Sequence, residues 1–412
     1  MRTTRRELLA GALALATLPA LSACAASQAE PAAAKPVSPP PPARTTGLAG
    51  TLYASTASGL VAVDLATGKQ IREYGEAVPD AGWERLHQVK DGRLRVLDLP
   101  SGKVRREAPV SGTQVKVVSR AGELVAVGPP PGPRTSTLIS LAGPDGGRDL
   151  RLGGNVEPEA FSTDGQVMYV LEYLPPDKPD RYRVRVLDLP SGTPKPLNTR
   201  DKKPVPEGKE EEMRGQGRQA VLDADAGVLY TLYTHQPDHL HTRDLIAGGD
   251  SAPGVHAFVH VLQLDQRWAY CLDLPQPFGL GPPKAHTLAL SPDGRTLFVY
   301  DATSGRIAQA DTTDLTVKRT AFGAKHTGEA YALADDQHLY LAAGTSLQLA
   351  DPATLAPRGT WQLPGPARGL ATLNGQLLAG AGDRVIALDE KGTQQAGIPV
   401  PGLRSLHHAA HP

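Results

Sequence analysis

Short apolar runs separated by turn residues follow one another from about residue 48 to residue 412. Runs such as 59–64 and 93–98 are typical of β-strands, because they are short, rich in Val and Leu, and followed by a glycine turn. No long stretch of this region repeats apolar residues at the i, i+3 and i+4 positions of an amphipathic helix. The pattern therefore predicts an all-β body.

One of these strands, ending in Asp or a small residue before a turn, recurs along the body. Its clearest copies are 59–69, 93–103 and 182–192. Weaker copies lie at 136–145, 258–265, 306–314, 346–354 and 384–391. Asp accepts hydrogen bonds from the turn backbone and Gly adopts positive φ, so both residue types suit this place. The count of copies predicts eight repeats.

A second recurring segment is a hairpin with an Asp-Gly turn, of which 291–300 is the cleanest copy and 161–170 a close match. The two segments together give four strands per unit and a spacing of about 40 residues, the blade period of propellers. A single four-stranded sheet cannot bury both faces, whereas sheets packed around an axis can. We predict a β-propeller of eight four-stranded blades, with seven as the alternative because the unit at 82–110 is short. The strand near 403–409 should complete the first blade beside Leu52.

Two segments resemble repeats of known propeller families. Residues 291–318 resemble a YVTN-type repeat, and residues 61–69 are similar to the repeat of quinoprotein-type propellers. The resemblance implies the fold of bacterial exported and surface propellers, and it says little about function. Quinoprotein repeats usually carry a Trp after the turn, where this chain has Arg72, and the chain lacks a vicinal cysteine pair. No quinone, and no other cofactor, is therefore expected.

The first residues have the features of an export signal. Arg5 and Arg6 precede an apolar run, 8–21, that is too short to cross a hydrocarbon layer of about 30 Å as a helix. The arginine pair resembles the twin-arginine export signal, which implies export of a folded protein. An ordinary secretion signal is the alternative.

The tetrapeptide Leu21-Ser22-Ala23-Cys24 ends the apolar run and resembles a bacterial lipobox. The resemblance implies cleavage before Cys24 and attachment of lipid to its sulfur. The residues that follow are rich in Ala and Pro, a composition that favours an extended, disordered linker. The predicted organisation is a lipoprotein signal peptide at 1–23, the lipidated cysteine and linker at 24–47, and the propeller at 48–412.

Charge balance and cysteine content limit the classes of partner and the disulfides that the chain can have. The chain has 43 basic and 43 acidic side chains, a balance that argues against nucleic acid as a partner. Only two cysteines are present, so lipid on Cys24 leaves Cys271 without a disulfide partner in the same chain. Cys271 lies in an apolar run, and we expect a buried, inert thiol there.

The spacing of repeats nearly doubles between Asp188 and Asp265, because of insertions near 195–217 and 234–254. Long loops on a rigid scaffold often carry binding residues. The first insertion is highly charged, and we expect it to be solvated and mobile. The second insertion and the strand after it are the best indication of a ligand-binding site. The candidate residues are His235, His239, His241, Arg243, His256 and His260.

The histidines of the second insertion and of the strand after it are candidates for metal binding. His256 and His260 share one face of a predicted strand, and imidazoles so arranged suit zinc or copper. However, no Cys, Asp or Glu stands at an established ligand spacing from these histidines, so the sequence-based expectation is no metal. Nucleophile-elbow, zinc-protease and phosphate-loop motifs are missing from the sequence, and no catalytic residue is assigned.

The sequence thus predicts an exported, membrane-anchored propeller that acts as a non-catalytic binding or protein-interaction scaffold. The expected partners are the membrane, through the lipid anchor, and an envelope protein or a small-molecule ligand, and the protein is expected to be a monomer. Two alternatives stay open. One is a propeller enzyme (lactonase-like, lyase or quinone-dependent) with its site at the axial channel, and the other is an envelope-assembly lipoprotein.

Overall fold

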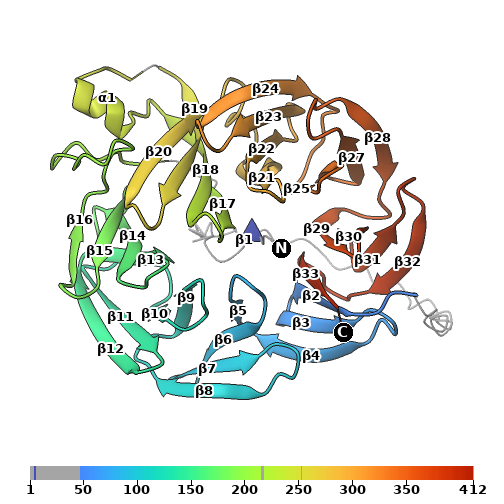
Figure 1. The fold of residues 1–412 in the computed structure, drawn as a ribbon, viewed down its shortest axis with the longest axis horizontal. Helices are drawn as coiled ribbons and strands as arrows, with labels where there is room; N and C mark the ends of the chain where they lie inside the picture. Colours follow the sequence, from blue (N-terminus) through green and yellow to red (C-terminus); the bar gives the residue numbers. More distant parts are fainter. Residues whose placement is uncertain (1–3, 6–46, 215–217, 252, 412) are drawn as a thin grey trace, which may run out of the picture.

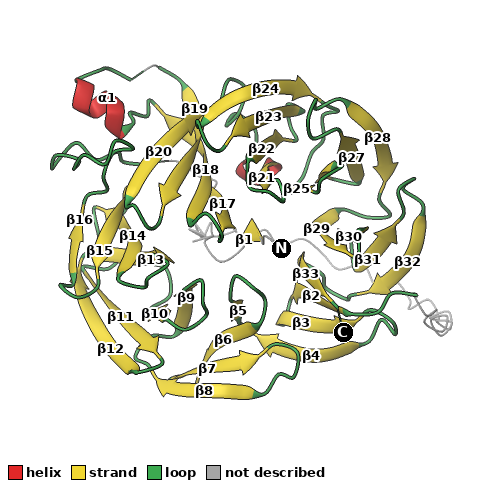
Figure 2. Ribbon diagram, in the orientation of Figure 1, coloured by secondary structure: helices red, strands yellow, loops and turns green. Residues whose placement is uncertain are grey.

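Eight four-stranded sheets surround a common axis in the computed structural model, which describes residues 4–5, 47–214, 218–251 and 253–411 (Figure 1). The predicted all-β propeller of eight four-stranded blades is confirmed. Helical elements of the described residues are α1 (Thr242–Ala247) and the 3-10 turn η1 (Pro283–Ala285) (Figure 2). None of the described helices is long and apolar enough to span a membrane. Cys24, nearly all of the signal peptide and all but the last residue of the linker lie outside the described residues.

We number the blades along the chain and give their strands from the axis outward. Blade 1 comprises β33 (Ser405–Ala410), β2 (Thr51–Thr56), β3 (Gly59–Asp64) and β4 (Gln70–Gly75). Blade 2 comprises β5 (Val78–Pro79), β6 (Arg85–Lys90), β7 (Arg93–Asp98) and β8 (Val104–Pro109). Blade 3 comprises β9 (Gln114–Val118), β10 (Val125–Gly128), β11 (Ser136–Gly143) and β12 (Gly146–Gly153). Blade 4 comprises β13 (Asn155–Phe161), β14 (Val167–Leu174), β15 (Arg181–Asp188) and β16 (Thr193–Lys195).

The second half of the ring repeats this order. Blade 5 comprises β17 (Arg218–Asp223), β18 (Val228–Pro237), β19 (Val255–Gln263) and β20 (Trp268–Asp273), and the two-residue strand β1 (Thr4–Arg5) pairs with β17. Blade 6 comprises β21 (His286–Leu290), β22 (Thr296–Asp301), β23 (Arg306–Asp311) and β24 (Thr316–Phe322). Blade 7 comprises β25 (Ala330–Ala334), β26 (Leu339–Ala343), β27 (Ser346–Ala350) and β28 (Pro357–Gln362). Blade 8 comprises β29 (Ala367–Leu373), β30 (Gln376–Ala381), β31 (Arg384–Leu388) and β32 (Gln394–Pro399).

The eight recurring strands of the sequence form the third strand of each blade, and turn chemistry explains why. Asp351, which follows β27, accepts hydrogen bonds from the backbone N–H groups of Ala353 and Thr354 at 2.9 and 2.8 Å. These hydrogen bonds hold the pKa of Asp351 at about 2. Gly102, at the corresponding turn of blade 2, has φ +64°, a conformation that residues with a Cβ rarely adopt.

Ring closure joins the two ends of the propeller. β33 pairs with β2, and Leu52 lies opposite Ala409, as the sequence predicts. Apolar clusters fill each of the eight interfaces between neighbouring blades in the described chain. A blade therefore buries both faces against its neighbours, and the core has the form of a ring.

An axial cavity of about 850 Å³ lies inside the ring, bordered mainly by blades 1 to 5. Its lining includes Lys116 and Glu157 from the innermost strands of blades 3 and 4, and Ser55 from the second strand of blade 1. Of the histidines that the structure describes, only His407 borders this cavity. The candidate histidines of the second insertion therefore do not face the axial cavity.

Candidate metal centre

The two outer strands of blade 5 place four potential ligands on one face. Alternate residues of a strand share a face, so His256, Phe258 and His260 of β19 point the same way. In the antiparallel register His260 lies opposite Cys271 of β20, and Phe258 lies opposite Asp273. Buried Phe258 and Cys271 pack in the apolar cluster between blades 4 and 5. This face of blade 5 thus looks toward blade 4.

The part of the charged insertion around residues 210–213 passes over this face. Met213 and Tyr182 of β15 exchange backbone hydrogen bonds of 2.8 and 3.0 Å, which join the insertion to blade 4. Just before Met213, the side chain of Glu210 accepts hydrogen bonds from Arg183 and Arg185 at 2.9 and 3.0 Å. In an extended segment the next side chain points the opposite way, and Glu211 enters the space above β19 and β20.

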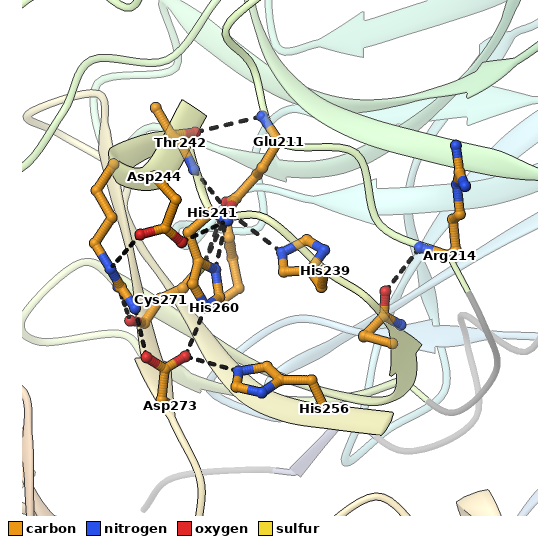
Figure 3. A network of polar contacts seen from close by, with 12 residues as sticks. Glu211, Arg214, His239, His241, Thr242, Asp244, His256, His260, Cys271 and Asp273 are labelled. Atoms are coloured by element: carbon orange, nitrogen blue, oxygen red, sulfur yellow. Dashed lines mark hydrogen bonds and ion pairs between the residues drawn. The ribbon is translucent and has the colours of Figure 1, made fainter. Parts of the chain in front are cut away.

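The second insertion covers the same space with the segment that leads into α1. The backbone N–H of His241 donates to Asp244 Oδ2 at 3.1 Å, which fixes the first turn of the helix. Thr242 connects the two insertions, because its hydroxyl accepts from the Glu211 N–H and its own N–H donates to Glu211 Oε2, both at 3.4 Å. His239 and His241 then face Glu211, while α1 lies at the periphery of the ring (Figures 1 and 3).

Glu211 lies at the centre of a group that we call the inner cluster: Glu211, His239, His241, His260 and Cys271 (Figure 3). Its Oε2 lies 3.3 Å from His241 Nδ1 and 3.7 Å from His239 Nε2. Its Oε1 lies 3.5 Å from His260 Nε2, and the Cys271 thiol donates to this oxygen at 3.2 Å.

The inner cluster is closed off from water. Glu211 is 9% exposed, and the side chains of His239 and His260 are 2% exposed. Phe258 stacks on the His239 ring at 4.6 Å between centroids and holds that ring in place. Among the described residues, no hydrogen-bond partner reaches His239 Nε2, although this atom is buried. A buried polar atom without a partner is costly, so a ligand bound at this nitrogen would be stabilising.

The spacing of the donor atoms around each oxygen of Glu211 is compatible with metal binding. Zinc binds imidazole nitrogen and carboxylate oxygen at about 2.0 to 2.1 Å, so the edges of its tetrahedron measure about 3.3 to 3.4 Å. Glu211 Oε2 lies 3.3 Å from His241 and 3.7 Å from His239, and Glu211 Oε1 lies 3.5 Å from His260, so each distance is close to such an edge. Among the described residues the donors form two sets of three, Glu211 with His239 and His241, and Glu211 with His260 and Cys271, and the donor atoms of each set lie within 4.8 Å of one another.

Burial and the contacts within the inner cluster shift the pKa values of its side chains. Burial would raise the pKa of Glu211, but its imidazole neighbours outweigh burial and hold the pKa well below its usual range. Burial and the Glu211 carboxylate raise the pKa of the Cys271 thiol well above its usual value, which favours the protonated thiol. Burial would lower the pKa of His241, but hydrogen bonds to Asp273 and Glu211 raise it to about 9.

A second group lies on the solvent side of His241, and we call it the outer group: His241, His256 and Asp273. Asp273 Oδ1 lies 2.6 Å from His241 Nε2 and 2.8 Å from His256 Nε2. The other carboxylate oxygen accepts from the Arg243 guanidinium, which also donates to the Cys271 carbonyl at 2.8 Å. The outer group is thus held in place from the α1 side.

Five of the six candidate residues from the sequence converge here. Four are histidines of the two groups, and Arg243 orients Asp273. His235 does not join them, since it has φ 57° and its ring lies 6.3 Å from that of His286 in blade 6.

Sequence reasoning missed Glu211, Cys271 and Asp273 as ligands. Cys271 is buried, as expected, but its thiol contacts the Glu211 carboxylate, and it lies opposite His260 on the neighbouring strand. The expectation of a solvated first insertion is wrong for Glu210 and Glu211, both 9% exposed, because arginines and imidazoles pair with them. The sequence did contain one indication of these ligands: Cys271 and Asp273 are two residues apart on one strand, so their side chains share a face.

No protein-family model matches the chain, and no curated protein matches it. The chain is similar to the structure of apo AztD from Citrobacter koseri, with a TM-score of 0.50 and 11% identity, over 87% of this chain and 97% of that chain. It is also similar to BamB from Moraxella catarrhalis, with a TM-score of 0.43 and 13% identity, over 80% of this chain and 92% of that chain. At this level of identity the similarity concerns the fold alone.

Proposed function

We propose that the protein is a non-catalytic binding protein for a divalent transition-metal ion, above all zinc, which the inner cluster holds. The observation that carries the proposal is the buried carboxylate of Glu211, with two imidazole nitrogens and a thiol within 3.5 Å of its oxygens. Imidazole, carboxylate and thiolate together suit zinc, cobalt and copper, whereas calcium and magnesium prefer oxygen ligands alone.

Burial favours holding the ion over catalysis. A catalytic zinc site keeps a position open to water or substrate, whereas a site that only holds zinc is filled by protein ligands. Here the inner cluster offers five donor residues and is covered by the first insertion and the α1 segment. The proposal departs from the sequence-based expectation of no metal, because folding supplies the carboxylate and thiol that the local spacing lacked.

The test is direct titration of the metal-stripped protein with Co²⁺ and Zn²⁺, followed by calorimetry and elemental analysis. We expect one tightly bound ion and, for Co²⁺, a thiolate-to-cobalt charge-transfer band that reports ligation by Cys271. Bound metal should also raise Tm, because 100-fold excess over Kd stabilises the folded state by about 2.7 kcal/mol.

Three variants make this test specific. C271S should abolish the charge-transfer band and weaken binding, and H239Q should weaken binding while the band is kept. H235Q is the matched control, since His235 belongs to the same insertion and lies outside the inner cluster. Binding that is equal in all three variants, or absent from the wild type, would reject the inner cluster as a metal site.

We further propose that the protein works outside the cytoplasm on a lipid tether at Cys24. The arginine pair Arg5-Arg6 and the lipobox that ends at Cys24 support this location. An exported propeller with the inner cluster would take up metal ions from the extracytoplasmic space. Metabolic labelling with palmitate should mark the wild type and not C24A, and an unlabelled wild type would overturn the tether.

A further inference from the structure

His241 belongs to both groups, and each of its ring nitrogens faces one of them. Nδ1 lies 3.3 Å from Glu211 in the inner cluster, and Nε2 lies 2.6 Å from Asp273 in the outer group. A single imidazole therefore separates a buried set of donors from a second set nearer the solvent (Figure 3).

The two groups differ sharply in exposure. The side chains of His256 and Asp273 are 34% and 44% exposed, whereas those of Glu211 and His239 are 10% and 2% exposed. A hydrated ion from solution can thus reach the outer group without any opening of the fold. The inner cluster offers no comparable access from water.

Charge makes the outer group the weaker of the two. The Arg243 guanidinium pairs with Asp273, so it repels a second cation there and takes up part of the carboxylate charge. The inner cluster has a carboxylate and a thiol, and a thiolate binds zinc more strongly than an exposed carboxylate does. An ion at the outer group therefore gains free energy by moving inward.

We infer that the outer group captures the metal ion first and delivers it through His241 to the inner cluster. This inference rests on the proposed function. The ion first binds Nε2 of His241 with His256 and Asp273, and then exchanges these for Nδ1 of His241 with Glu211 and the other inner donors. His256 is thus a positioning residue for loading and does not hold the ion at equilibrium.

The test separates rates from equilibrium. Metal-stripped protein is mixed with Co²⁺, growth of the thiolate-to-cobalt band gives the association rate, and transfer of Co²⁺ to EDTA gives the release rate. For H256Q we expect both rates to fall by the same factor, roughly tenfold, with Kd unchanged. A residue that assists loading must assist unloading equally, because the equilibrium does not depend on the route.

Two comparisons complete the experiment. H239Q, which alters the inner cluster, should speed release and raise Kd without slowing association, and H235Q should match the wild type. H256N serves as a second variant in case H256Q folds poorly, with circular dichroism as the check.

Two outcomes overturn the inference. An unchanged association rate in both His256 variants would mean that the ion arrives by another path. A rise in Kd as large as that of H239Q would make His256 a ligand of the final site. A wild type that binds no Co²⁺ would instead reject the proposed function itself.

Discussion

Glu211 is the residue on which the proposed site depends. A carboxylate removed from water needs compensating partners, since an unpaired buried charge costs several kcal/mol. His239, His241 and His260 surround Glu211, and Cys271 donates a hydrogen bond to it. A divalent cation would replace protons on these same atoms, which is how metal binding couples to proton release.

His408 provides a residue-scale prediction for the pH dependence of stability. It stacks on Trp83 at 4.9 Å, and burial lowers its pKa from 6.5 to about 4. Between these values the unfolded chain binds the proton and the folded chain does not, so stability is full above pH 6.5 and declines toward pH 4. H408F keeps the stacking and does not titrate, so its stability should gain about 2 kcal/mol relative to the wild type over this window.

The measurement is chemical denaturation of the wild type and H408F at pH 7.5 and pH 4.5. At each pH we take the difference in free energy of unfolding between H408F and the wild type, and we compare this difference at the two pH values. Contributions from other titrating groups cancel, because both proteins contain them. H411Q alters an exposed histidine near the same strand and serves as the control. Parallel pH profiles for the wild type and H408F would contradict the prediction.

At the residue level, the sequence predicted which histidines lie close together, but it did not predict the carboxylates and the thiol that they contact. His256 and His260 share a face by strand periodicity, which any sequence with that strand would reveal. Glu211 reaches His260 only because the first insertion, 49 residues earlier in the chain, folds back over blade 5. Local spacing carries no information about such a tertiary contact.

At the scale of elements, the segment Glu210-Glu211-Glu212 acts as a short strand without a sheet of its own. Its alternation sends Glu210 and Glu212 to arginines of β15 and Glu211 to the histidines. The sequence displayed three acidic residues and indicated a solvated loop, because nothing local shows that Arg181, Arg183 and Arg185 lie beside them. The pairing is long-range and was therefore not predictable from composition.

An element-scale prediction follows from this alternation. Glu210 is buried between Arg183 and Arg185 and fixes the backbone that carries Glu211. E210Q should weaken metal binding by about 10- to 100-fold, as loss of a contact that orients a ligand does. E212Q changes the neighbouring, half-exposed carboxylate that pairs with Arg181, and exposed pairs contribute at most about 1 kcal/mol.

E210Q and E212Q make the same change of residue type and of charge, and both side chains face arginines of β15. Competition with a chelator of known affinity gives Kd for both variants. Equal weakening in the two variants would show that net charge, and not the position of Glu211, controls affinity.

At the scale of the whole molecule, the ring was the most predictable feature. Each of the eight third strands carries its own turn residues, so the sequence encodes the blades one at a time. The count of copies and the closure of blade 1 by the strand near 403–409 are both confirmed. The axial cavity and the inner cluster were beyond such reasoning, because they depend on which side chains of different blades meet.

Removal of β33 tests how far stability depends on closure. A chain that ends before Ser405 loses Leu406, whose buried side chain alone contributes about 2 kcal/mol, and leaves the inner edge of β2 unpaired. We expect the free energy of unfolding, measured by urea denaturation, to fall by more than this amount. Removal of residues 411 and 412 alone should change it by less than about 0.5 kcal/mol, and equal stability of both truncations would contradict the role of β33.

Closure by β33 also has a consequence for biosynthesis. Blade 1 takes three strands from residues 51–75 and its innermost strand from residues 405–410, so it stays incomplete until residues 405–410 have been translated. A nascent chain on the ribosome therefore presents an unpaired β2 until β33 has been made, and a chaperone that shields strand edges would act during that interval. Every product of premature termination shares this open edge, which quality-control proteases can recognise.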